Sequence, residues 1–150
     1  MALIQSGYVL GTLPVARPQT AYATHSQLFI VDVPAAGFAS GDILELAVLP
    51  PYSVIVDAKL VPIGSLGAAT VDVGIMSGEV GELLNSDGSA RTNGNQIFAG
   101  AALTGLVRLT KTDPLVLPQT EKPRSIGVTF SAAVTAGAGK RIGLLLDFVQ

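Results

Sequence analysis

The sequence contains no cysteine and no tryptophan, and its 150 residues include a single histidine, His25. Without cysteine the chain can form neither a disulfide framework nor a thiolate metal site. A catalytic triad or a histidine metal centre would have to be built around His25 alone. His25 lies in a polar stretch at the start of an expected strand, so we interpret it as a solvated strand-end residue. We therefore predict no catalytic residue, no cofactor and no metal site.

Charge is also scarce. Charged residues make up 13% of the chain, against about 25% in ordinary soluble domains. The net charge of −2 gives no electrostatic basis for binding nucleic acid. Asp32, Asp57 and Lys59 interrupt the longest apolar stretches, so we expect no membrane-spanning helix of about 20 apolar residues. A chain with few charges and no membrane span is explained if other protein subunits cover much of its surface.

Short apolar runs separated by turn residues are what the chain does contain. Three of them follow one another at residues 43–49, 53–63 and 69–76, with Pro50-Pro51 and residues 64–67 between them. Apolar and polar side chains alternate within these runs, which is the pattern of half-buried strands. The tight connections predict that the three strands are antiparallel neighbours.

Further strands are expected along the rest of the chain, at residues 21–33, 105–111, 115–117, 125–131 and 141–149, and residues 97–103 are ambiguous between strand and helical turn. The short run 115–117 stands between prolines, as an edge strand would. The turn at residues 137–140 is expected to form a hairpin before the last strand. About eight strands without an amphipathic helix predict an all-β, antiparallel two-sheet sandwich of jelly-roll type. An immunoglobulin-like sandwich is the alternative.

The alternation also predicts the core. The inward rows are expected to be Val54/Val56/Leu60, Val71/Val73/Ile75, Ile126/Val128/Phe130 and Ile142/Leu144/Leu146/Phe148.

Residues 1–20 are expected to form an extended N-terminal arm, and residues 21–150 the single sandwich domain. Glycines and prolines in the arm exclude a long helix or a central strand. Fully extended, twenty residues span roughly 66 Å, so the arm can reach a neighbouring subunit. We expect the chain to be a homodimer or homotrimer and deletion of residues 2–12 to leave the sandwich's melting temperature little changed. The expected interface residues are Leu3, Ile4, Tyr8, Val9 and Leu10. A segment wrapped on its own sandwich is the alternative.

Acidic residues on the expected strands are the remaining candidates for chemistry. A pair of them could perform glycoside hydrolysis, but each lies opposite an apolar row, which places them on the solvent face of the sheets. They are Glu45, Asp57, Asp72 and Asp147. The stretch 85–88 resembles part of a calcium loop but lacks the distant glutamate, so we interpret it as a turn. It belongs to a long surface segment, residues 77–112.

Three stretches carry a resemblance to a known family: Gly41–Pro50, Val54–Leu60 and Leu66–Gly74. Their strand pattern resembles the jelly-roll head decoration (cement) proteins of tailed bacteriophages. The resemblance implies a non-enzymatic virion protein that sits on the outer capsid surface and bridges coat subunits, with the major capsid protein as its partner. It carries no catalytic residues.

A carbohydrate-binding sandwich module of a phage tail or fibre is the alternative function. Such sites usually present exposed aromatic rings, and here the tyrosines are Tyr8, Tyr22 and Tyr52 only. The scarcity of aromatic residues favours the structural role.

Overall fold

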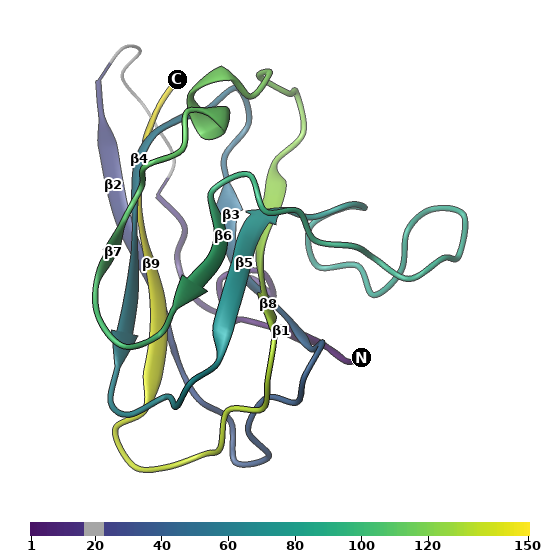
Figure 1. Ribbon diagram of the computed structural model, residues 1–150. Coiled ribbons are helices and arrows are strands. Elements are labelled where there is room, and N and C mark those ends of the chain that lie inside the picture. Colours follow the sequence, from purple (N-terminus) through teal and green to yellow (C-terminus); the bar gives the residue numbers. More distant parts are fainter. Residues whose placement is uncertain (17–22) are drawn as a thin grey trace.

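Two β-sheets pack face to face in the computed structural model, which describes residues 1–16 and 23–150 (Figure 1). Sheet A has the strand order β1-β3-β8-β5-β6, and sheet B has the order β2-β9-β4-β7. Neighbouring strands are antiparallel except for β1, which lies parallel to β3. The strands are β1 (Leu3–Gln5), β2 (His25–Asp32), β3 (Ile43–Leu49), β4 (Val54–Ile63), β5 (Thr70–Ile75), β6 (Phe98–Ala102), β7 (Val107–Arg108), β8 (Arg124–Phe130) and β9 (Arg141–Val149).

This strand order is that of a jelly roll. From β2 to β9 the chain passes from one sheet to the other at every connection except β5 to β6. Each sheet therefore interleaves strands from both halves of the chain, as two Greek keys do. The predicted all-β, two-sheet jelly roll is confirmed, and β1 adds a fifth strand at the β3 edge of sheet A. The boundary expected between residues 20 and 21 lies outside the described residues.

The three consecutive strands expected to be neighbours do not pair with one another. β3 and β5 both pair with β8, whereas β4 pairs with β9 in the opposite sheet. Pro50 and Pro51 cannot donate the hydrogen bonds of a hairpin, and Tyr52 redirects the chain with a φ of 58°. The Tyr52 amide donates to the Thr120 carbonyl at 2.8 Å. Residues 137–140 likewise connect sheet A to sheet B, so that turn is not a hairpin.

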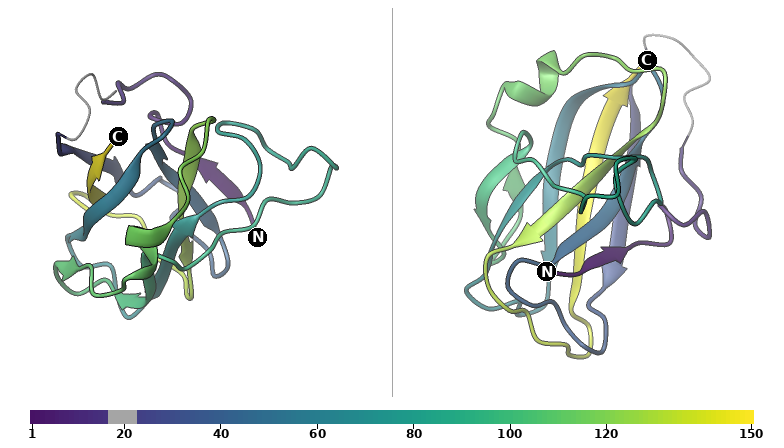
Figure 2. Two further views of the ribbon diagram at one scale, coloured as in Figure 1. Left: turned by 90° about the horizontal axis from the view of Figure 1, so that it is seen from above. Right: turned by 90° about the vertical axis from the view of Figure 1, so that its right-hand side faces the viewer.

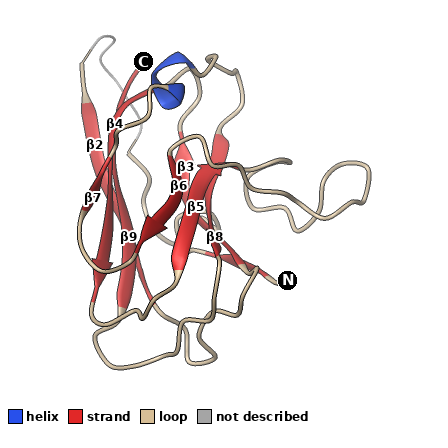
Figure 3. Cartoon of the chain, viewed as in Figure 1, coloured by secondary structure: helices blue, strands red, loops and turns tan. Residues whose placement is uncertain are grey.

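The edge strand expected at residues 115–117 is wrong. A short 3-10 helix, η1 (Asp113–Val116), occupies this position (Figure 3). Pro114 lies in its first turn, where a preset φ favours helix and no amide donor is needed. The ambiguous residues 97–103 form β6. No helix in residues 1–16 and 23–150 combines the length and hydropathy required to cross a membrane.

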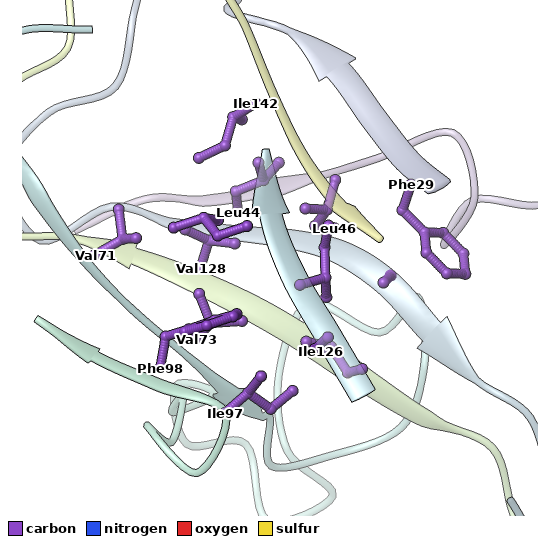
Figure 4. Close-up of a cluster of buried hydrophobic side chains, with 14 of the residues drawn as sticks. Phe29, Leu44, Leu46, Val71, Val73, Ile97, Phe98, Ile126, Val128 and Ile142 are labelled. Atoms are coloured by element: carbon purple, nitrogen blue, oxygen red, sulfur yellow. The ribbon is translucent and has the colours of Figure 1, made fainter. Parts of the chain in front are cut away.

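The core fills the space between the two sheets. Figure 4 shows part of it, with Val73, Ile126 and Val128 from sheet A and Ile142 from sheet B. The expected rows of β8 and β9 are confirmed, because all of their side chains are buried. In the β5 row Val71 and Val73 are buried and Ile75 is partly buried.

The expected inward row of β4 is only partly right. Val56 is 37% exposed and Ile55 is fully buried, although Leu60 points inward as expected. The pairing of β4 with β9 shifts between Ile55 and Asp57. Such a β-bulge inserts an extra residue, and the strict alternation of faces therefore breaks at that point.

Truncation of Phe130 or Phe148 to alanine is expected to cost about 3–5 kcal/mol of unfolding free energy, as for other buried aromatic residues. Each ring is at most 1% exposed, and Phe130 stacks on Phe38 with ring centroids 4.2 Å apart. The control is Val56→Ala, which should cost less than about 1 kcal/mol. Urea denaturation measures the unfolding free energy of all three variants. A small loss for both phenylalanine variants would mean that these side chains do not face the core.

Candidate functional site

A buried ion pair joins sheet A to the segment that follows β5. Both side chains, Glu45 of β3 and Arg91, are fully buried, and Arg91 Nη1 lies 2.8 Å from Glu45 Oε1. The carboxylate also accepts hydrogen bonds from Gln5 Nε2 at 2.9 Å, from the Ser125 hydroxyl and from the Gly81 amide. Both carboxylate oxygens therefore have donors, which offsets the cost of removing the charge from water.

Arg91 also binds the backbone that precedes it and a side chain of β8. Its Nε donates to the Ser77 carbonyl and its Nη1 to the Glu82 carbonyl, both at 2.7 Å. Its Nη2 donates to the Ser125 hydroxyl oxygen at 3.2 Å. One guanidinium thus holds residues 77–95, which we name the excursion, against β3 and β8.

The base of the excursion packs closely on the outer face of sheet A because a glycine of β8 lies at the contact. A Cβ on Gly127 of β8 would lie 2.7 Å from Met76 Cγ and 2.8 Å from Asn93 Oδ1. Asn93 Nδ2 donates to Thr129 Oγ1 at 3.0 Å. In the right view of Figure 2 the excursion crosses in front of sheet A.

The expectation that Glu45 faces solvent is therefore wrong. All seven residues of β3 are buried, because the excursion covers Glu45 on the outer face of this strand and β1 pairs along its edge. Asp57, Asp72 and Asp147 remain partly exposed, as expected. Asp57 pairs with Lys59 at 3.6 Å.

The tip of the excursion is a small hairpin, residues 82–90, which we name the tip hairpin. An isolated bridge joins Leu84 to Ala90, and the Gly88 amide donates to the Asn85 carbonyl at 2.9 Å. The predicted turn at residues 85–88 is therefore confirmed. The Ser89 hydroxyl and amide donate to Asp87 and lower the pKa of its carboxyl group.

The tip hairpin projects from the sandwich and carries apolar side chains into solvent. Figures 1 and 2 show it standing away from both sheets. Leu83 is 67% exposed and Leu84 is 52% exposed. Exposed apolar residues on a hydrogen-bonded projection are typical of an interaction surface.

The N-terminal segment, residues 1–16, lies on its own sandwich. Leu3 and Ile4 belong to β1, and Tyr8 packs edge-on against Phe29 with ring centroids 4.9 Å apart. Of the five expected interface residues, Val9 is buried, Leu3, Ile4 and Tyr8 are half-buried, and Leu10 is exposed. The structure does not bring these five residues together on one exposed face, and their part in subunit contacts stays a prediction.

A groove separates this segment from the turn between β3 and β4. Its volume is about 820 Å³. Leu13, Pro14 and Val15 form one wall and Pro50 and Pro51 the other. The Gln27 side chain holds the first wall in place, because its Nε2 donates to the Pro14 carbonyl at 2.8 Å.

A smaller hollow of about 290 Å³ continues the groove, since Val80 and Pro123 line both. Its polar side chains include Glu79, Lys122 and Arg124. Glu79 and Lys122 form an ion pair, in which the pKa of Glu79 is lowered and that of Lys122 is raised. Burial lowers the pKa of the Arg124 guanidinium. The described residues place no carboxylate within ion-pair distance of Arg124.

Among residues 1–16 and 23–150, the side chains considered for catalysis do not lie together in one site. His25 begins β2 as expected, but its ring is half-buried and stacks on Phe148 at 6.1 Å instead of standing in solvent. In the described part of the chain, no three histidine or acidic side chains lie together as metal ligands.

Sequence reasoning missed Arg91 as a structural residue. The sequence did contain one signal: Arg91 is the single basic residue of the excursion, and Glu45 is the single polar residue of β3.

Replacement of Arg91 by methionine is expected to cost about 3–5 kcal/mol of unfolding free energy, because it leaves Glu45 buried without a counter-ion. Glu45→Gln/Arg91→Met should cost less than the two single variants summed. Lys122→Met, which breaks the exposed pair with Glu79, is the control and should change stability little. Urea denaturation measures the series, and equal losses at positions 91 and 122 would contradict the assigned importance of the buried pair.

Deletion of residues 2–12 is now expected to destabilise the sandwich, in contrast to the expectation from sequence. It removes β1 and the Gln5 hydrogen bond to Glu45. Hydrogen bonds to charged groups contribute about 1.5–3 kcal/mol, and each kcal/mol shifts the melting temperature by roughly 2–4 °C at this size. Calorimetry should show a fall of at least about 5 °C, with Leu10→Ser as the control. An unchanged melting temperature would contradict this expectation and support the role in subunit contacts that the sequence predicts for the arm.

No protein-family model matches the chain, and no curated protein matches it. Among solved structures, a chain from the capsid of Ralstonia phage GP4 superposes with a TM-score of 0.83. A chain from the acid-stable capsid of Helicobacter pylori bacteriophage KHP30 gives 0.55 at 12% identity, covering 87% of this chain and 90% of that one. A chain from the capsid asymmetric unit of cyanophage Pam1 gives 0.52 at 12% identity, covering 93% and 94%.

The last two similarities show the shared fold. The GP4 chain is 39% identical, and the alignment covers 99% of this chain and 98% of that chain. With that identity over nearly the whole of both sequences, the chain belongs to a family of bacteriophage capsid proteins.

Proposed function

We propose that this protein is a non-enzymatic decoration protein that binds the outer surface of a phage head and stabilises it by bridging neighbouring coat subunits. The observation that carries the proposal is the 39% identity to a chain of the GP4 capsid over 99% of this chain. The head decoration pattern in residues 41–74 supports the same role.

The self-contained fold favours decoration over a place in the shell wall. Residues 1–16 pack on their own sandwich, and β9 lies inside sheet B between β2 and β4. Among the described residues, the core is therefore built from strands of one chain. Such a protein can fold first and then bind a finished shell as a unit.

The surface composition fits a protein that works between subunits. Only 13% of the residues are charged, and large apolar side chains are exposed at the tip hairpin, on η1 and on the outer face of sheet B. Contact with coat subunits would remove such side chains from water, which is favourable at about 25 cal/mol per Å².

No observation favours the carbohydrate-binding alternative. Among the described residues, Tyr52 is the one aromatic residue with an exposed side chain, at 49%. The Tyr8 ring is packed against Phe29. A single exposed ring does not make the stacking platform that such modules use.

The test uses shells of the parent phage produced from a genome that lacks this gene. We expect these shells to assemble, to bind the purified protein saturably in co-sedimentation, and to withstand higher temperature once it is bound. Heat-unfolded protein is the control for non-specific adsorption. Cryo-electron microscopy of the reconstituted particles should then show density on the outer surface across coat subunit boundaries.

Two outcomes would contradict the proposal. Failure of the shell to assemble without the protein would make it part of the shell wall. Normal assembly without any binding of the added protein would remove it from the outer surface.

A further inference from the structure

Two unpartnered surfaces of this chain have matching chemistry. The first is the tip hairpin, where Leu83 and Leu84 are exposed. Glu82 and Asp87 flank these leucines, and residues 82–90 contain no basic side chain. Asp87 accepts hydrogen bonds from the Ser89 amide and hydroxyl, which lower the pKa of its carboxyl group. The hairpin therefore presents an apolar pair with negative charge beside it.

The second surface is the groove with its smaller continuation. Leu13, Pro14 and Pro50 make its long part apolar. Its far end holds Arg124, whose Nε is buried without a hydrogen-bond partner among the described residues. Residues 17–22 contain no Asp or Glu that could pair with it. The guanidinium is partly buried, and its Nη2 donates to the Ser53 carbonyl at 3.3 Å. With no carboxylate beside it, this cationic end of the groove favours an acidic ligand.

We propose that copies of this protein associate head to tail, with the tip hairpin of one copy lying in the groove of the next. Leu83 and Leu84 fill the apolar part, and Asp87 pairs with Arg124 of the receiving copy. Burial of the two leucines supplies most of the affinity, and the ion pair fixes the orientation. The inference concerns the free protein and does not depend on binding to a shell.

The tip hairpin points away from the groove of its own copy and therefore does not dock there. Val80, at the base of the excursion, lines the groove, but the hairpin itself projects away from sheet A (Figures 1 and 2). Arg91 and Glu45 hold the base of the excursion, so little conformational freedom is lost on docking. A contact between two different patches is heterologous and produces closed rings or open chains.

The first experiment measures the mass of the free protein by light scattering and sedimentation across a range of concentrations. Leu84→Asp disables the hairpin and Leu13→Asp disables the groove, and each should weaken association at least about tenfold. Leu106→Asp is the matched control, because Leu106 is 54% exposed in the connection between β6 and β7, outside both surfaces. Circular dichroism and melting temperature confirm that all three variants stay folded.

The second experiment mixes the two disabled variants. The Leu13→Asp copy keeps an intact hairpin and the Leu84→Asp copy keeps an intact groove, so the mixture should form a 1:1 heterodimer although each variant alone is monomeric. A symmetric interface, in which both copies use the same patch, would not be restored by mixing. Arg124→Gln should reduce the salt dependence of association in the unmodified background.

Three results would overturn the proposal. One is a wild-type protein that stays monomeric at the highest concentration reached. Another is association that Leu106→Asp weakens as much as Leu84→Asp does. The third is a mixture of the two disabled variants that remains monomeric. Each can occur whether or not the protein binds shells, so failure here is distinguishable from failure of the decoration role.

Discussion

The buried pair of Glu45 and Arg91 is the interaction that holds the excursion on sheet A, and the rest of the surface depends on it. A carboxylate on the outer face of a β-sheet is ordinarily left in water, where it costs nothing. Here it is enclosed, and enclosure requires that a counter-ion and several donors arrive from other parts of the chain. Gln5 comes from β1, Ser125 from β8 and Arg91 from the excursion. One buried charge thus ties three separate segments to β3.

The location of the pair also explains how an irregular segment keeps a fixed position on one side of the sandwich. Burial of an ion pair is seldom favourable compared with an apolar contact, and its best-attested benefit is a unique arrangement. An apolar contact between the excursion and sheet A would permit sliding, whereas the guanidinium fixes Ser77 and Glu82 by directed hydrogen bonds. The pair therefore gives an irregular segment a defined position. A capsid protein needs such a position if a loop is to meet the same surface in every copy.

Local patterns in the sequence identified most strands but not their partners. The limits of β3 and β9 agree with the apolar runs at 43–49 and 141–149, because strong alternation is a local signal. Pairing is not local, and the short turn at Pro50-Pro51 is compatible with a hairpin or with a passage between sheets. The face of Val56 depends on a bulge that its neighbours in sequence do not announce. Glu45 and Arg91 lie 46 residues apart, so no nearby pattern could join them.

The position of β9 has a consequence for how the protein is made. This strand begins at Arg141 and lies in the interior of sheet B, with β2 on one side and β4 on the other. A nascent chain that has not yet released it exposes the edges of both flanking strands, and open edges invite pairing with other chains. The sandwich therefore forms only after β9 has been synthesised, and its non-local pairings make that step slow. In a cell filled with capsid proteins, the interval before β9 inserts is when this chain is most exposed to misassembly.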